Sequence, residues 1–511
     1  MLFNSYLYLL VFLPFAVISY RLIDRSRARW AAGWLAVVSL LYYCSWHADP
    51  SGAWRPWPLM LMCCSVLFNF SAGRALLALR ETRWCRPLLW LGVGVNLSVL
   101  FWFKYSLFFA RIAQDVGMSF ESLPDVILPL GISFVTFQKI AFLVDVSEGK
   151  VSRFSFKDFA LFVLFFPQLI AGPIVHHAEM MPQFRVRRRA GWIDFSVGLT
   201  ILVIGLFKKV VIADMLARDA SLFFNLAASG HRELTFAEGW CAAFLYALQL
   251  YFDFSGYSDM AIGSARLFGI RLPENFFSPY KAVSIVDFWR RWHITLSRFL
   301  RDYLYIKLGG NRHGAARRYM NLFVTMLLGG LWHGAGFAFV LWGALHGLLL
   351  SLNHAWFAFR KRTGLRALPR PAAIALTLVV VVTLWVPFRA GTIEFTNPAG
   401  ALKAVKNIWG AMYGFHGFDA WPSVGERIAG LDKVLRFIPV LIGVLLIPNT
   451  QQFMGRYRPV FAFNIQEGRI TGPRRWWQWR PNLVWLGFTL LLLLFIGLEF
   501  NKVSEFIYFQ F

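Results

Sequence analysis

His333 lies in the apolar stretch LLGGLWHGAGFAFVLWGALHG, residues 327–347, between Trp332 and Gly334. An ionisable ring in a segment this apolar costs free energy unless it faces a protein interior or a water-filled cavity, so intramembrane polar residues are candidates for function. A second histidine, His293, lies upstream in DFWRRWHITLSRFLRDYLYIKLGGNR, residues 287–312. The pair suggests a polar route into a membrane. The alternative for either residue is a core histidine with a satisfied hydrogen bond.

Histidine remains as the candidate catalytic group, because the sequence contains none of the common catalytic motifs. The chain has no G-x-S-x-G elbow, P-loop, dinucleotide fingerprint or H-E-x-x-H motif. The unperturbed pKa of imidazole, about 6.5, suits a general base, and burial favours its neutral form. A neutral imidazole in a membrane tunnel could take the proton of a hydroxyl group that attacks a thioester, without a covalent enzyme intermediate. Separation of donor and acceptor across the membrane would explain why the site lies there.

The segment around His293 has the periodicity of an amphipathic helix over residues 287–304. One face would carry Trp289, Trp292, Leu296, Phe299, Leu300 and Tyr303, and the other Asp287, Arg290, Arg291, Arg298, Arg301 and Asp302. His293 falls at the border of the two faces, where it could line a wet tunnel. The alternative is a helix that only anchors the chain at the membrane surface.

Carboxylates interrupt another apolar stretch, QLYFDFSGYSDMAIG, which contains Asp253, Tyr257 and Asp259. In such a segment these side chains must be paired or hydrated. They would either line the tunnel and support a histidine, or form structural pairs with the basic segment, for example with Arg290 or Arg291.

The remaining histidines are less suited to chemistry. His176 and His177 precede Glu179, which could suggest a metal, but adjacent residues of one helix point about 100° apart and are poor joint ligands. We therefore expect a cytoplasmic loop there and no metal site. His346 and His354 lie in the second half of the His333 hairpin, where a structural role is expected.

Composition places these residues in a polytopic membrane protein. The chain has 511 residues, of which 58% are hydrophobic and 15% charged, whereas soluble domains carry about 25% charged residues. The net charge of +25 comes from basic residues in short loops, a distribution that follows the positive-inside rule and does not indicate nucleic-acid binding. The five cysteines show no paired spacing, so neither a disulfide framework nor a zinc site is expected.

The apolar runs predict about twelve crossings. Basic loops at Arg21, Arg74 and Arg360 are expected in the cytoplasm, with both termini in the periplasm. The predicted spans are residues 2–20, 30–46, 58–73, 88–110, 192–212, 239–267, a hairpin over 321–356, and then 372–388, 434–447 and 483–500. Of two further runs, 126–144 and 159–175, one is expected to be re-entrant, because otherwise the arginines of residues 185–189 would be periplasmic.

The two histidine segments together resemble the membrane-bound O-acyltransferase (MBOAT) family, and in particular its bacterial alginate O-acetyltransferase branch. The resembling stretches are LIAGPIVHHAEMMPQF, YFDFSGYSDMAIG, NFFSPYKAVSIVDFWRRWHITLSRFLRDYLYIKLGGNRHG, GGLWHGAGFAFVLWGALHG and the closing FIYFQF. They extend over nearly the whole chain. The family pattern has proline where this chain has Lys307, a departure that leaves both histidines untouched.

The resemblance implies one membrane domain over residues 1–511, with a catalytic core over roughly 126–390 and C-terminal spans over 431–511. It implies an all-α ring of about twelve transmembrane or re-entrant helices around a thinned central tunnel. His333 would be the catalytic residue and His293 the second tunnel histidine. The residues expected to line or support the tunnel are Trp332, Gly334, Trp292, Arg290, Arg291, Asp253, Tyr257 and Asp259.

The activity that the resemblance implies is O-acetylation. An acetyl group would pass from acetyl-CoA or an acylated carrier, with no bound cofactor, across the bacterial inner membrane. Periplasmic acetyltransferase partner proteins would then modify an exopolysaccharide such as alginate. Acyltransferases of peptidoglycan, cellulose and teichoic acid share the motifs and stay open as alternatives. A transporter or channel would also tolerate intramembrane histidines, but the matching inverted halves of many transporters are not evident in the sequence.

Overall fold

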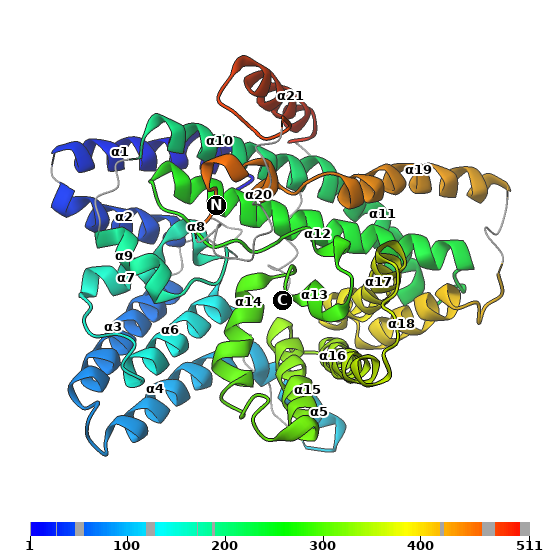
Figure 1. Cartoon of the computed structure of the whole chain (residues 1–511), viewed down its shortest axis with the longest axis horizontal. Helices are drawn as coiled ribbons and strands as arrows, with labels where there is room; N and C mark the ends of the chain where they lie inside the picture. The colour runs from blue at the N-terminus through cyan, green and yellow to red at the C-terminus, as the bar shows by residue number, and fades with distance from the viewer. Residues whose placement is uncertain are drawn as a thin grey trace. The chain divides into compact units, whose positions relative to one another are not determined.

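The computed structural model describes residues 2–26, 28–45, 56–118, 128–170, 172–185, 190–418, 424–461 and 476–500. Throughout these residues the secondary structure is helical, without strands (Figure 1), which confirms the predicted all-α class. The beginning of the run 126–144, the arginines at 187–189 and the closing FIYFQF lie outside the described residues.

The chain divides into two compact units whose sequences interleave. Unit 1 comprises Met1–Val203, Tyr257–Pro273 and Met454–Trp485, and unit 2 comprises Ile204–Gly256, Glu274–Phe453 and Leu486–Phe511. The helices α10 (Trp192–Leu206), α12 (Phe236–Leu267) and α21 (Leu483–Glu499) contribute residues to both units.

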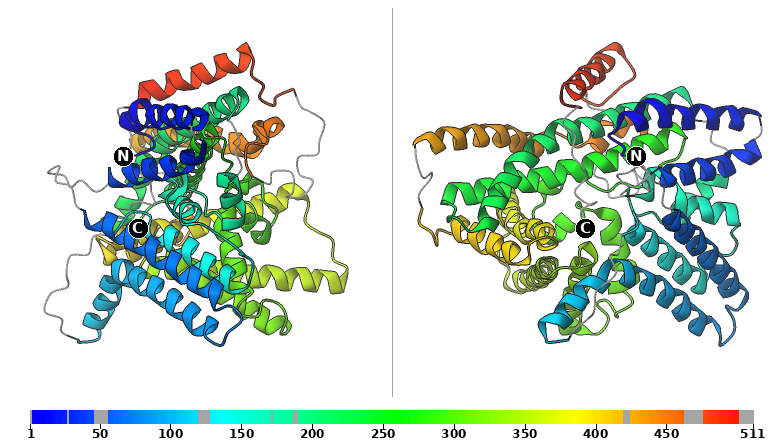
Figure 2. Two further views of the ribbon diagram at one scale, coloured as in Figure 1. Left: turned by 90° about the vertical axis from the view of Figure 1, so that its left-hand side faces the viewer. Right: turned by 180° about the vertical axis from the view of Figure 1, so that it is seen from behind.

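Unit 1 is built mainly from the N-terminal helices. Its elements are η1 (Leu7–Phe12), α1 (Leu13–Ser26), α2 (Ala28–Cys44), α3 (Trp57–Ala78), α4 (Cys85–Leu100), η2 (Phe101–Tyr105), α5 (Ser106–Asp115), α6 (Ile132–Ser147), α7 (Phe156–Leu164), α8 (Phe166–Leu169), α9 (His177–Arg185) and η6 (Gly455–Tyr457). Helix α6 packs against both α3 and α4 (Figure 2). Buried Asn69 of α3 and Asn96 of α4 exchange amide hydrogen bonds of 3.2 and 2.8 Å, the kind of polar contact that joins helices inside a membrane.

The run 159–175 is broken in unit 1. Helix α7 has nine residues and rises about 13 Å, less than half of the roughly 30 Å hydrocarbon core. The backbone leaves the helical conformation at Phe165, and the freed amide of Phe166 donates to Ser39 Oγ over 3.1 Å. This run therefore does not cross a membrane as a single helix.

Unit 2 contains the histidine segments. Its elements are η3 (Phe207–Ala213), α11 (Asp214–Ser229), η4 (Pro279–Lys281), α13 (Ile285–Trp289), α14 (Ile294–Leu300), η5 (Arg301–Tyr305), α15 (Gly314–His333), α16 (Phe337–Thr363), α17 (Arg370–Glu394), α18 (Pro398–Met412), α19 (Val424–Leu446), α20 (Thr450–Phe453) and α21 (Leu483–Glu499). Helix α16 packs against α15 on one side and α17 on the other, and α18 packs against α11 and α17 (Figure 1).

The predicted hairpin over 321–356 is confirmed as α15 and α16. Their backbones come into contact because Gly330 and Gly343 face each other, and a Cβ built on Gly330 would lie 2.3 Å from the carbonyl oxygen of Phe339. Small residues allow such close approach between membrane helices. Helix α16 ends with Arg360, Lys361 and Arg362 in its last turn and Gly364 in the left-handed conformation, a favourable charge and backbone for a C-terminus.

Within the described residues, six helices are long and apolar enough to cross a membrane: Leu7–Ser26, Trp57–Ala78, Cys85–Asp115, Trp192–Ser229, Phe337–Thr363 and Arg370–Glu394. These helices confirm a multi-pass membrane protein. The number of about twelve crossings and the orientation of the termini stay predictions.

Candidate active site

His333 is the last residue of α15 and is only 4% exposed. Its ring is enclosed by aromatic side chains, with centroid distances of 4.9 Å to Trp332, 5.1 Å to Trp342 and 5.1 Å to Phe388. These residues come from α15, α16 and α17. Three helices thus converge on one imidazole at the end of the hairpin.

The turn that follows His333 is held from α17. The carboxylate of Glu394 accepts hydrogen bonds from the backbone amides of Phe337, over 2.7 Å, and Ala338, over 2.8 Å. These are among the first amides of α16, which have no partner within their own helix, and a carboxylate at a helix N-terminus also interacts favourably with the helix dipole. Glu394 therefore caps α16 where the hairpin begins its second helix.

Glycines make room for this arrangement. A Cβ on Gly334 would lie 2.3 Å from the ring of Phe339, and one on Gly391 would lie 2.5 Å from the same ring. The Phe339 ring is thus seated between the turn and α17, and it packs edge-on against Phe388 at 5.2 Å. Gly334 therefore contributes to the packing of the turn, and its role in lining a tunnel stays a prediction.

The prediction of one amphipathic helix over 287–304 is wrong. The segment forms α13, a turn over residues 290–293, and then α14 and η5. His293 has φ 42° and ψ 53°, a left-handed conformation that is uncommon for residues other than glycine. The turn is held from outside, because the amide of Ile294 donates to the carbonyl of Asn275 and that of Phe277 to the carbonyl of Arg291, each over 2.9 Å.

The side chain of Asn275 sets the tautomer of His293. Its Oδ1 accepts from the hydroxyl of Thr295 over 2.9 Å and lies 3.0 Å from His293 Nδ1. Because an amide oxygen only accepts hydrogen bonds, Nδ1 must carry the proton. Nε2 then holds the lone pair, and it is buried with no hydrogen-bond partner among the described residues. Burial lowers the pKa of His293 well below its ordinary value, so the ring is neutral near pH 7.

Trp332 connects the two histidines. Its ring lies 4.9 Å from that of His333 and 6.4 Å from that of His293, measured between centroids. His293 also meets Phe254 edge-on at 4.7 Å. The structure therefore brings together the two histidines that the sequence analysis singled out, within one buried aromatic cluster.

Trp292 extends this cluster, and His346 joins it. The Trp292 ring lies 4.8 Å from that of Trp385. The indole Nε1 of Trp289 donates to His346 Nδ1 over 3.2 Å, and the His346 ring lies 4.7 Å from Trp342. His346 thus joins α13 to α16, in agreement with a structural role, and Nε2 of this ring is buried without a partner among the described residues.

Asp253 forms an ion pair with a lysine. Its Oδ1 lies 2.7 Å from Lys209 Nζ, which also lies 2.8 Å from Asp214 Oδ1, and all three side chains are buried. Arg291, proposed as a partner, pairs instead with Asp287 at 2.9 Å.

The remaining predicted support residues are Arg290, Tyr257 and Asp259. Arg290 is exposed. Tyr257 and Asp259 belong to unit 1, where Tyr257 stacks on Phe3 at 4.8 Å. Among the residues of the cluster itself, Asn275 and Glu394 were missed by the sequence analysis.

The geometric reason given against His176 and His177 does not hold. Helix α9 begins at His177, so His176 lies outside it, and the ring centroids are 4.2 Å apart. Both rings lie against the buried Asp145, whose Oδ2 is 2.7 Å from His176 Nε2 and 3.3 Å from His177 Nδ1. Lys150 Nζ lies 3.0 Å from the other oxygen of the same carboxylate, so Asp145 already has a cationic partner.

Comparison with known proteins agrees with these features. Residues 59–385, which include both histidines, match the model of the MBOAT, membrane-bound O-acyltransferase family. The chain is 42% identical over 440 residues to a peptidoglycan O-acetyltransferase of Helicobacter pylori, covering 80% of each chain. It is 37% identical to the probable alginate O-acetylase AlgI of Pseudomonas putida over the whole of both chains. It is 27% identical to a teichoic acid D-alanyltransferase of Streptococcus thermophilus, over 47% of this chain and 62% of that one.

The family match includes the hairpin of α15 and α16 and the turn of His293, and two of these relatives are similar over most of their length. A helical membrane protein with this match catalyses acyl transfer. The chain belongs to the membrane-bound O-acyltransferase family.

Proposed function

We propose that this acyltransferase transfers acetyl groups from a cytoplasmic thioester, acetyl-CoA or an acylated carrier, across the inner membrane for O-acetylation of an exopolysaccharide such as alginate. The similarity to the alginate O-acetylase AlgI over the full length of both chains supports this substrate class. Periplasmic acetyltransferases would be the partners that receive the acetyl group and place it on the polymer.

The observation that carries the mechanism is the joint contact of both histidine rings with Trp332 inside the buried cluster. In the proposed reaction His333 removes the proton from the acceptor hydroxyl as its oxygen attacks the thioester carbonyl. The new C–O bond forms, the C–S bond breaks, and the departing thiolate takes the proton from the imidazolium. No further reactant is needed.

His293 would assist by accepting a hydrogen bond. Its Nε2 lone pair is the group that the Asn275 contact leaves available, so it can orient an acceptor hydroxyl or a water molecule near the reacting carbonyl. A buried lone pair without a partner costs free energy in the empty site, and a bound hydroxyl would remove that cost. His293 is therefore proposed as an orienting group and His333 as the base.

Peptidoglycan is the second candidate polymer. It is favoured by the 42% identity to the Helicobacter pylori peptidoglycan O-acetyltransferase over 80% of each chain. The two substrates can be separated by deleting the gene in its own host and measuring O-acetyl esters in purified exopolysaccharide and in isolated muropeptides. Loss of ester from the exopolysaccharide alone supports the first proposal, and loss from muropeptides alone supports the second.

The catalytic proposal is tested by complementing that deletion with His333→Gln. Glutamine keeps a polar side chain but cannot act as a base near neutral pH, and removal of a general base costs about 10²–10⁴-fold. Acetylation should fall to the detection limit at normal protein level. His354→Gln, on α16 but outside the cluster, is the matched control and should acetylate normally. Near-normal acetylation by a stably inserted His333→Gln protein would show that His333 is structural.

A further inference from the structure

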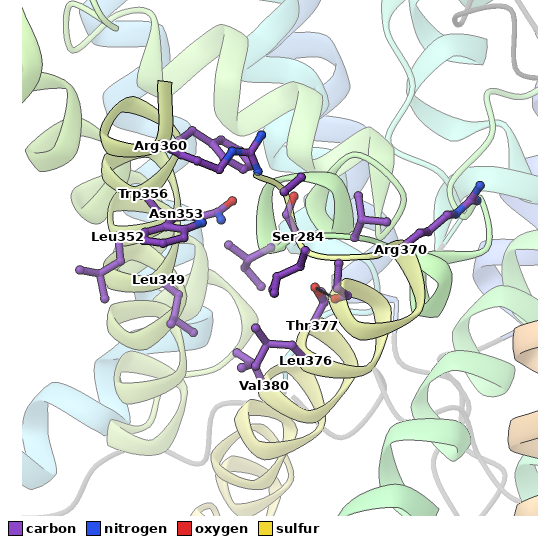
Figure 3. A pocket seen from close by; sticks show the side chains of 16 residues that line it. Ser284, Leu349, Leu352, Asn353, Trp356, Arg360, Arg370, Leu376, Thr377 and Val380 are labelled. Atoms are coloured by element: carbon purple, nitrogen blue, oxygen red, sulfur yellow. Dashed lines mark hydrogen bonds between the residues drawn. The ribbon is translucent and has the colours of Figure 1, made fainter. Parts of the chain in front are cut away.

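A deep slot opens between α16 and α17, away from the histidine cluster. Its volume is about 710 Å³, and Figure 3 shows its lining side chains. Most of its wall is apolar, with Leu349, Leu352 and Trp356 from α16 and Leu376 and Val380 from α17. Neither His333 nor His293 is among the residues that line it.

The walls of the slot face the place where lipid chains would lie. Both α16 and α17 are long and apolar enough to cross a membrane. Leu352 and Leu376 are 54% and 55% exposed in the protein alone. A soluble, polar ligand would bury little apolar surface in a groove whose walls are open to the bilayer. A hydrocarbon chain can pack favourably against these walls.

The depth of the slot matches one leaflet. The lining of α16 extends from Leu349 to Arg360, and that of α17 from Arg370 to Val380. At about 1.5 Å per residue these stretches rise about 16 and 15 Å, close to half of the roughly 30 Å hydrocarbon core. An occupant of this length reaches from the membrane surface to the bilayer centre.

The mouth of the slot is basic. Arg360 and Arg370 lie at the same end of the slot, one on each helix, and the Arg370 side chain extends away from Arg360 (Figure 3). Arginine binds phosphate through paired hydrogen bonds as well as through its charge. Because the loop between α16 and α17 is expected on the cytoplasmic side, these arginines would meet a leaflet surface enriched in anionic lipid.

A polar group deeper in the slot points to an ester. Asn353 lies about 10 Å below Arg360 along α16, with its amide turned into the slot (Figure 3). Its Oδ1 is buried and has no hydrogen-bond partner among the described residues. A carboxamide can turn over and present its N–H group, so Asn353 can donate to a lipid ester carbonyl below the phosphate.

We propose that this slot is a binding site for one anionic phospholipid, with its phosphate between Arg360 and Arg370, an ester carbonyl at Asn353, and its acyl chains along Leu352 and Leu376. Ser284, which also lines the slot, caps α13 by accepting from the amide of Asp287 over 3.1 Å. Lipid bound there packs against the helix that precedes the His293 turn, and so contributes to the stability of unit 2.

The test uses full-length protein in detergent exchanged into phosphatidylglycerol or phosphatidylcholine, with bound lipid counted by native mass spectrometry. Wild-type protein should retain one phosphatidylglycerol in preference to phosphatidylcholine. Since each basic residue near an anionic surface contributes about fivefold in binding, the double variant Arg360→Gln, Arg370→Gln should lose about 25-fold of that preference. Arg366→Gln, in the same loop but outside the lining, should lose at most about fivefold of it.

Asn353→Leu provides the second measurement. It should weaken retention of both lipids and leave their ratio unchanged, because both carry the same ester. The proposal is overturned if the double arginine variant keeps the wild-type preference, or if Arg366→Gln loses it equally. It is also overturned if the arginine variants lose binding of coenzyme A and retain phosphatidylglycerol, since the slot would then be a donor entrance.

Discussion

Replacement of Glu394 by glutamine should slow acyl transfer even though its carboxylate contacts the protein backbone and not His333. In the structure both carboxylate oxygens accept amides of the first turn of α16, over 2.7 and 2.8 Å. Glutamine keeps one oxygen acceptor, so one hydrogen bond to a charged group is lost, about 1.5 kcal/mol at the low end of the range. Loss of the negative charge at the helix N-terminus adds about 0.5 kcal/mol.

The sum, about 2 kcal/mol, is the free energy by which Glu394→Gln should destabilise the ordered turn after His333. Displacement of a catalytic group by about 1 Å can cost 10²-fold, so a partly populated displaced turn should lower kcat about tenfold. KM for the thioester donor should change little, because the contacts of Glu394 are with backbone amides of α16. The assay is acetyl transfer by purified protein in liposomes, normalised to folded protein measured by thermal shift.

Gly336 allows the same contact to be broken from the other side. Its φ of −162° is accessible to any residue, but a Cβ there would lie 2.8 Å from Glu394 Oε2. Gly336→Ala should therefore displace the carboxylate without backbone strain and reproduce the Glu394→Gln defect. Because both changes remove one interaction, the double variant should be no worse than either single one. Additive defects, or wild-type kcat in Glu394→Gln, would refute the reasoning.

Three further predictions concern other parts of the molecule. Burial lowers the pKa of His293 from 6.5 to about 3, so at this residue the unfolded chain binds a proton that the folded protein excludes. The contribution of His293 to stability should be constant above about pH 6.5 and fall as the pH is lowered below it. His293→Asn, which tolerates the left-handed backbone, should reduce the pH dependence of stability in thermal-shift measurements. Lys209→Met leaves Asp214 and Asp253 without this cation and should lower the free energy of unfolding by about 3–5 kcal/mol. Replacing both aspartates by leucine as well should recover much of the folded yield. Reporter fusions in the loop at Arg360 should be active only as cytoplasmic reporters, and a periplasmic signal there would reverse the predicted topology.

The hairpin with His333 at its end could be predicted from the sequence because its signals are local. Two apolar runs are separated by a histidine and closely spaced glycines, so the position of the turn is visible in the sequence. The confirmed helical class likewise follows from apolar runs that are too long for strands.

The break at His293 could not be predicted in this way. The apolar periodicity of Trp289, Trp292 and Leu296 continues through the turn, and the contacts that interrupt the helix come from Asn275, 18 residues upstream. Glu394 is separated by 57 residues from the amide of Phe337 that it caps. Such partners are set by tertiary packing, so side-chain periodicity carries no information about them.

The longest helix has a consequence for the bilayer around it. Trp192–Ser229 is one continuous helix of 38 residues, about 57 Å long, which exceeds the hydrocarbon thickness almost twofold. Its uncharged part is short, however, since charged side chains occur at Asp194 and again from Lys208 to Asp219. Asp219 pairs with Arg436 at 3.5 Å. The uncharged stretch between Asp194 and Lys208 is only about 20 Å long. Such a hydrophobic mismatch is relieved when the bilayer thins around the helix, so the protein should be most stable in bilayers of short-chain lipids.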